Sequence, residues 1–399
     1  MAHDDPVSAR VGTPDEVFGA FLKLGLTSFG GPIAHLGYFR DELVIRRKWL
    51  DEAAYAELVA LCQFLPGPAS SQVGFALGLT RAGPLGALAA WTAFTLPSAI
   101  LMLLLVLASG KVGGPVADTV FHGLKLVAVV IVAQAVWGMA RTLTPDLRRA
   151  GIALAAAAVV LLASGAAGQV AAILFGALAG VLFCRHVAIA PGRWAPIAIS
   201  RRVGGACLAL FALLLVGLPV LATAVDLRSV ALFDIFYRAG ALVFGGGHVV
   251  LPLLRDALVL PGWMTDDRFL AGYGAAQAMP GPLFTISAYL GGVAGGVAGA
   301  ALALIGIFLP GLLLVIGVLP FWSALRDNAG VRAAIVGVNA AAVGILALAL
   351  YDPLWTNSVT SWVDVLLIGT GLVALMRYGF PPIAIVVGMV IATAGLARL

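Results

Sequence analysis

The chain has 399 residues, of which 61% are hydrophobic and 11% are charged. Soluble globular domains carry about 25% charged residues, so this chain cannot cover a water-exposed surface. Apolar stretches of about 20 residues, each long enough to cross a bilayer, recur along its length. This composition excludes a soluble enzyme, a nucleic-acid-binding domain and a disordered protein. It predicts an all-α polytopic membrane protein.

The first 17 residues form a polar, acidic segment without the basic region of a signal peptide. We expect residues 1–17 to be a cytoplasmic tail. Thr13, Pro14 and the two acidic residues that follow predict the cap and first turn of a helix that starts near Phe18.

The chain contains an internal repeat. Residues 18–44 match residues 233–259 at an offset of 215, and the match continues at an offset of 214 and then 213. Arg40-Asp41 returns as Arg255-Asp256. The motif Gln63-x-x-Pro66-Gly67-Pro68 returns as Gln277-x-x-Pro280-Gly281-Pro282. Apolar composition alone would not repeat such residues in the same order, so the chain consists of two homologous halves.

Glycine and proline interrupt several apolar segments. Proline lacks an N–H and glycine loses more backbone entropy than other residues, so these motifs break helices. In lipid a break persists only where protein buries it or where it lines a wet cavity. We therefore predict broken, re-entrant hairpins at 18–43, 54–80, 232–256 and 268–297. A full span at 18–43 is the alternative. Continuous spans are expected at 84–109, 117–140, 150–165, 168–185, 204–224, 299–320, 331–351, 362–376 and 380–397.

The span at 204–224 has no counterpart in the other half, and it inverts the second half relative to the first. The charges agree. With a cytoplasmic amino terminus, sixteen of the 24 Lys and Arg residues flank the cytoplasmic side, five flank the outer side and three lie in apolar segments. We expect a first repeat at 18–187, a linker with the extra helix at 188–229 and an inverted second repeat at 230–399.

At these motifs the sequence resembles the chromate transporter family in its long, two-half form. The likeness rests on Phe29-Gly30-Gly31-Pro32 and on Gln63-x-x-Pro66-Gly67-Pro68, with degenerate copies in the second half. Gly247 replaces Pro32 in the second copy and His248 follows it, so the halves are not equivalent. The resemblance implies transport of chromate, with sulfate as the isosteric competitor, across the bacterial inner membrane.

Inverted repeats with discontinuous helices are typical of secondary transporters, which bind substrate near the midplane. A half-helix amino terminus offers free N–H groups and the positive end of a dipole to an anion. Lys23 and Arg238 add a cation to the first broken segment of each half, where a buried charge is expensive and usually functional. A Lys held by a nearby carboxylate is the competing interpretation. The predicted substrate-binding residues are Lys23, Thr27, Gly30, Gly31, Gln63, Pro66, Gly67, Arg238, Gly245, Gly246, Gln277 and Gly281.

A second set of residues is predicted to act in gating or coupling. The adjacent pairs Arg40-Asp41 and Arg255-Asp256 end the first hairpins, where they are either structural locks or gates. Glu57 is expected to carry a coupling proton or to face lipid headgroups. Lys125 and its counterpart Asn339 are expected at the interface between the halves.

No catalytic constellation is present: HExxH, GxSxG and Walker A motifs are missing, and the three cysteines are scattered. We therefore predict neither an enzyme nor a metal or cofactor. A membrane enzyme would require His35, His248 and Glu57 to converge. The favoured function is export of chromate, driven by the membrane potential or by proton exchange, which confers resistance. The alternative is sulfate uptake in the same fold. The expected partners are the anion and the bilayer, with a homodimer left open.

Overall fold

The computed structural model describes residues 12–29, 31–109, 115–163, 166–185, 199–225, 227–244 and 247–396. These residues form helices and connecting turns without a strand. Five helical segments are long and apolar enough to cross a membrane: Ala69–Ala108, Thr119–Leu143, Arg201–Ala224, Leu283–Leu325 and Ala329–Ser358. The predicted all-α polytopic fold is confirmed.

The first half begins with two interrupted helices. α1 (Pro14–Thr27) starts at a Thr13 cap, whose hydroxyl accepts the Glu16 N–H. This confirms the predicted cap, although the helix begins four residues before Phe18. After a break that begins at Ser28, the chain continues as α2 (Gly31–Phe39) and a π-helical turn, η1 (Arg40–Arg46). α3 (Glu52–Phe64) then precedes a second break at 65–68 and α4 (Ala69–Ser109).

α4 is a tight helical hairpin. Ala82 and Gly83 leave helical geometry, with φ of −142° and +65°, and the chain turns back on itself. A Cβ on Gly78 would lie 2.3 Å from the Gly86 carbonyl oxygen across this turn. The glycines thus allow a half-helix to pack directly against the following span.

The second half repeats this order. α9 (Arg228–Leu242), a break, η2 (Gly247–Val249) and α10 (Val250–Leu258) correspond to α1, α2 and η1. α11 (Asp266–Ala276), a second break, η3 (Leu283–Thr285) and α12 (Ile286–Val318) correspond to α3 and α4. α12 turns back at Gly295 and Gly296, where a Cβ on Gly291 would lie 2.3 Å from the Gly299 carbonyl oxygen.

The remaining helices complete each half. The first half has α5 (Pro115–Leu143), α6 (Leu147–Leu162) and α7 (Ala166–Phe183), and α8 (Arg201–Ala224) follows it. The second half has η4 (Leu319–Phe321), α13 (Trp322–Asp327), α14 (Ala329–Ala349), η5 (Leu350–Trp355), α15 (Thr356–Ser358), α16 (Trp362–Met376) and α17 (Pro382–Leu396).

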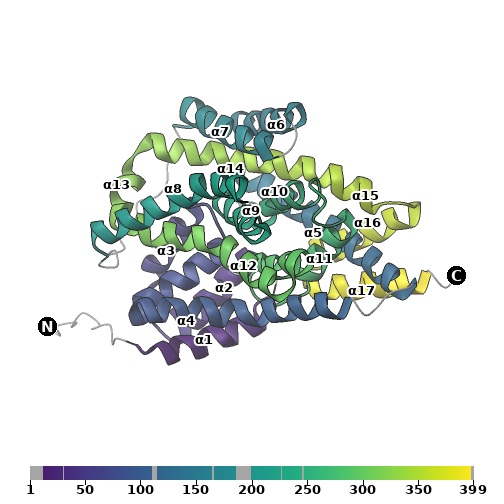
Figure 1. Ribbon diagram of the computed structural model, residues 1–399, viewed down its shortest axis with the longest axis horizontal. Coiled ribbons are helices and arrows are strands. Elements are labelled where there is room, and N and C mark those ends of the chain that lie inside the picture. Colours follow the sequence, from purple (N-terminus) through teal and green to yellow (C-terminus); the bar gives the residue numbers. More distant parts are fainter. Residues whose placement is uncertain are drawn as a thin grey trace.

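The two halves interlock. Within each half the first helix packs on the long hairpin, α1 on α4 and α9 on α12, and α4 also contacts α12. The last two helices of each half cross over: α6 and α7 pack on α14, whereas α16 and α17 pack on α5 (Figure 1). Because each half covers the other, the bilayer-spanning body is shared between them.

α8 lies against α9 and α12 of the second half. Much of its apolar surface stays exposed, including Leu213 and Val216. Such a face suits contact with lipid rather than with protein.

Candidate functional site

The four breaks meet at the contact between the halves. The N–H of Gly67, in the second break of the first half, donates to the Val243 carbonyl in the first break of the second half at 2.8 Å. The N–H of Gly281 donates in the same way to the Ser28 carbonyl, also at 2.8 Å. These two hydrogen bonds join equivalent positions in reciprocal directions, so the broken segments are paired across the halves.

Gly67 and Gly281 are the residues that the pairing requires. Their φ angles are +119° and +92°, in a region that favours glycine. A Cβ on Gly67 would lie 3.0 Å from Gln72 Nε2, and a Cβ on Gly281 would lie 3.1 Å from the Phe94 carbonyl oxygen. A side chain at either position would therefore separate the breaks.

The pairing occupies some of the N–H groups at the breaks. The amides of Gly67 and Gly281 are occupied by carbonyl oxygens. The first turns of α2 and α4 follow the breaks directly, and the first N–H groups of a helix have no intrahelical acceptor. Gly31, with φ of +81°, begins α2. The predicted residues Gly30, Gly245 and Gly246 lie outside the described residues.

Lys23 and Arg238 each have a carboxylate partner. Lys23 Nζ lies 2.7 Å from Glu42 Oε2, and Arg238 Nε donates to Asp234 Oδ1 at 2.9 Å. Both basic side chains are partly exposed, at 48% and 37%, while the carboxylates are buried. The sequence interpretation missed both carboxylates. Asp234 precedes Arg238 by four residues in one helix, and this spacing could have predicted their ion pair. Glu42 is brought to Lys23 by the α1–α2 turn, which the sequence spacing does not indicate.

The amide and hydroxyl residues lie at different depths. Gln63 is exposed and Gln277 is half-buried, with its Nε2 lacking a partner among the described residues. The Thr27 hydroxyl donates to the Lys23 carbonyl within α1. Sequence reasoning missed Gln72, which is buried and donates through Nε2 to the carbonyls of Pro66 and Gly311. Gln72 thus holds the second break of the first half against α12.

The Arg-Asp pairs at the ends of the first hairpins are not the principal ion pairs. Arg40 lies 3.8 Å from Asp41, but its Nη2 lies 2.7 Å from Glu52 Oε1 at the start of α3. In the second half Arg255 Nε lies 2.7 Å from Asp266 Oδ1 at the start of α11, and 3.8 Å separate it from Asp256. Each arginine therefore ties the first broken segment to the second. Asp256 instead accepts from Gln169 of α7 at 2.7 Å.

Lys125 and Glu57 each contact the other half. Lys125 of α5 lies 2.9 Å from Asp267 of α11. Glu57 is buried in α3, and the Trp322 indole N–H donates to it at 3.3 Å. Asn339 has a buried Oδ1 that no described residue contacts by a hydrogen bond.

His35, His248 and Glu57 have separate partners. His35 Nδ1 lies 3.3 Å from Ser70 Oγ, His248 is bonded to the Tyr273 hydroxyl, and Glu57 is bonded to Trp322. Within the described ranges no group of three His, Cys, Asp or Glu residues is placed to hold a metal ion.

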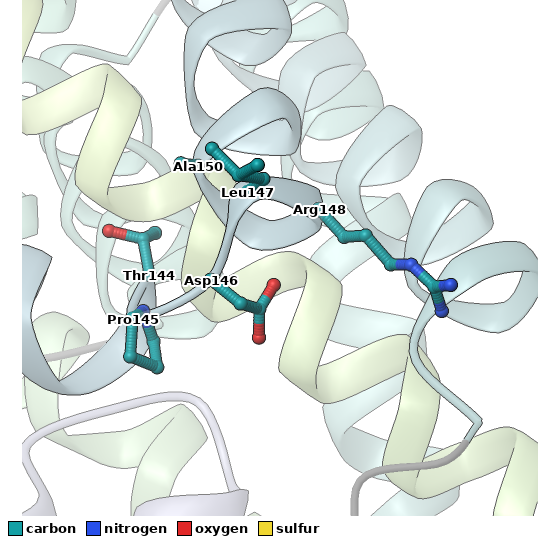
Figure 2. A pocket seen from close by; sticks show the side chains of 6 residues that line it. All are labelled: Thr144, Pro145, Asp146, Leu147, Arg148 and Ala150. Atoms are coloured by element: carbon teal, nitrogen blue, oxygen red, sulfur yellow. The ribbon is translucent and has the colours of Figure 1, made fainter.

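A surface hollow lies at the α5–α6 turn (Figure 2). The residues that line it include none of the candidate site residues described above. Asp146 in this hollow caps α6 by accepting the Arg149 N–H at 3.0 Å. That hydrogen bond, together with the Arg149 side chain, holds the pKa of Asp146 below its usual value. Helix capping therefore explains Asp146.

Comparison with known proteins gives consistent matches. The family model described as "Chromate transporter" matches residues 16–181 and again residues 230–396. A probable chromate transport protein of Synechococcus elongatus is 32% identical over 82% of this chain and 81% of that protein. Chromate transport proteins of Pseudomonas aeruginosa and Cupriavidus metallidurans are 29% and 30% identical, over 84% and 82% of this chain and 80% and 79% of their own lengths. No solved structure matches the chain.

Proposed function

The chain belongs to the chromate transporter family, and we propose that it is a secondary transporter that exports chromate across the bacterial inner membrane. Its amino terminus lies in the cytoplasm, and export confers resistance to chromate. The functional repeats are residues 18–187 and 230–399, joined by the linker at 188–229. No cofactor takes part.

The reciprocal pairing of the breaks is the observation that carries this proposal. Interrupted helices that meet between two homologous halves are the arrangement in which secondary transporters bind substrate. The Gly67–Val243 and Gly281–Ser28 hydrogen bonds connect all four interruptions. A movement of one half against the other would alter this junction first.

The proposed anion site lies at this junction. The N–H groups that open α2, α4, η2 and η3 supply hydrogen bonds to a tetrahedral oxyanion. Gly31 opens α2 with a positive φ and no side chain, which permits close approach to the backbone. Pro66, Gly67 and Gly281 hold the breaks in shape. Gly30, Gly245 and Gly246 are assigned to the same site from the sequence motif alone. Thr27, Gln63 and Gln277 flank the approach to the site.

Lys23 and Arg238 are proposed to supply positive potential beside the breaks. Their pairing with Glu42 and Asp234 reduces this potential. An incoming dianion competes with each carboxylate, since the basic side chains are partly exposed. The ion pairs therefore support a role in substrate entry.

A gating role follows for the ion pairs at the hairpin ends. Arg40 and Arg255 tie each first broken segment to the following helix, so relative movement of these segments must strain or break the pairs. Lys125 and Asn339 border the junction of the halves. Glu57 is a candidate for proton coupling because it is a buried carboxylate at that junction.

The membrane potential favours export. Each elementary charge gains about 2.3 kcal/mol per 100 mV, so a dianion that leaves a negative interior gains about twice that amount. Uptake of sulfate would instead require a co-transported cation. Oriented proteoliposomes with an imposed potential and labelled chromate test the direction, and unlabelled sulfate tests competition. Flux into the compartment that corresponds to the cytoplasm, against the potential, would refute export.

Neutral variants test Lys23 and Arg238. We expect Lys23→Met and Arg238→Gln to lower chromate flux at least about tenfold while the protein still inserts. The matched controls are the doubly neutral variants Lys23→Met/Glu42→Gln and Arg238→Gln/Asp234→Asn. If these recover wild-type flux, the basic residues only neutralise their carboxylates and have no role in binding.

A further inference from the structure

Several polar side chains beside the breaks of the first half are buried, and each has a polar atom without a hydrogen-bond partner in the described part of the chain. Ser28, His35, Ser71 and Thr95 have exposed fractions of 0% to 1%. The three hydroxyls and the Nε2 atom of His35 have no hydrogen-bond partner among the described residues. A buried polar group that makes no hydrogen bond destabilises a fold. Four such groups beside one set of breaks therefore require a physical explanation.

Ser28 lies at the point where Gly281 of the second half enters the first, and His35 lies beside it, whereas Ser71 lies in the first turn of α4 and Thr95 lies next to Phe94 farther along α4. Ser28 accepts the Gly281 N–H through its carbonyl, and the His35 ring approaches the Ser28 backbone. The same ring is bonded to Ser70 in the first turn of α4 and packs edge-on against Phe94 at 5.4 Å. Thr95 follows Phe94, whose carbonyl oxygen lies against Gly281.

The second half serves as an internal control, because duplication supplies the same positions. Val243, Val250, Phe284 and Phe308 stand where the first half has Ser28, His35, Ser70 and Thr95. All four are buried apolar residues, and Phe284 packs against Phe308. Thr285, the counterpart of Ser71, donates its hydroxyl to the Pro282 carbonyl. The fold therefore accepts apolar side chains at these positions, and packing does not require the polar groups of the first half.

The chemistry of the cluster suits an oxyanion. Serine and threonine hydroxyls donate hydrogen bonds. The first-turn N–H groups of α4 add further donors and the positive end of a helix. None of these four residues is a carboxylate.

We propose that the transported oxyanion is held asymmetrically, by Ser28, His35, Ser71 and Thr95 of the first half, with the second half contributing the Gly281 break but no equivalent side chains. This inference rests on the proposed function and specifies its site.

Equilibrium binding of labelled chromate to the purified full chain tests the inference, with unlabelled sulfate as competitor. Ser71→Ala and Thr95→Val each remove one hydroxyl with little change of volume. Each should raise the Kd for chromate at least about tenfold, as expected for a lost hydrogen bond to a charged group. The matched control is Ser287→Ala in α12, which removes another buried hydroxyl without a partner and should leave the Kd unchanged.

Each outcome separates the inference from the proposed function. Unchanged Kd values in both first-half variants would overturn the inference and leave the cluster as a site for water. A wild-type chain that binds neither chromate nor sulfate would refute the proposed function itself. Thermal stabilisation by sodium ions that both variants abolish, with chromate binding intact, would replace the anion by a cation. His35→Val, which copies Val250, extends the test, and the two isosteric variants decide the result if that variant does not fold.

Discussion

Replacing Gly281 by alanine should separate the paired breaks. At a φ of +92° a residue with a Cβ is strained by about 1–3 kcal/mol. The new Cβ would also lie 3.0 Å from Ser98 Oγ and 3.1 Å from the Phe94 carbonyl oxygen. Because the latter belongs to the α4 backbone, it cannot turn aside, and overpacking adds about 1–3 kcal/mol. If the break moves to relieve the contact, the hydrogen bond to the Ser28 carbonyl is lost, which costs about 0.5–1.5 kcal/mol.

Thermal unfolding of the purified protein in detergent measures this effect, with gel filtration of heated samples as the readout. Gly262→Ala is the matched control, because Gly262 also has a positive φ, +81°, but its Cβ would meet nothing within 4 Å. We expect Gly281→Ala to melt clearly below Gly262→Ala and to lose chromate flux. Equal melting temperatures and normal flux would show that the contact between the breaks is unimportant, and the reasoning about the junction would fail.

Three further predictions concern the ion pairs, the crossed hairpins and the topology. Arg255→Ala should lower stability by about 1–3 kcal/mol in thermal unfolding, because the Arg255–Asp266 side chains are only 17% and 27% exposed. Arg40→Ala should lower stability less, because the Arg40–Glu52 side chains are 47% and 55% exposed. Equal losses would contradict this. Gly344→Ala should impair packing of α6 on α14, since its Cβ would lie 1.9 Å from the Ala153 carbonyl oxygen of α6. Gly369→Ala, whose Cβ would meet nothing within 4 Å, should leave the packing intact. Gel filtration compares the two variants. Cysteines at Arg10 and Arg46 should label equally from the cytoplasm, and labelling from opposite sides would show that residues 18–43 span the membrane.

The elements and their breaks could be predicted because their causes are local. Pro66-Gly67-Pro68 ends a helix wherever it occurs, since proline has no N–H to donate and Gly67 adopts a φ that other residues avoid. The repeat of this motif at Pro280-Gly281-Pro282 required the same geometry in the second half. The apolar composition required these helices to be buried in a membrane or against each other.

The partners of the charged side chains were not predictable in this way. Arg40 and Arg255 stand next to an aspartate in the sequence, yet their closer partners are Glu52 and Asp266. Adjacent side chains on a helix point in different directions, whereas a residue 11 or 12 positions away can approach when the chain turns back. Lys23 meets Glu42 for the same reason.

By itself, the sequence determined the membrane class, the duplication and the positions where helices are interrupted, because these depend on composition and on the backbone preferences of proline and glycine. Only the tertiary structure decided that α6–α7 and α16–α17 pack on the opposite half. It also decided that the N–H groups of Gly67 and Gly281 donate to the carbonyls of Val243 and Ser28. Such pairings depend on which surfaces fit against each other in three dimensions, and residues more than 150 positions apart in the chain carry no local signal of that contact.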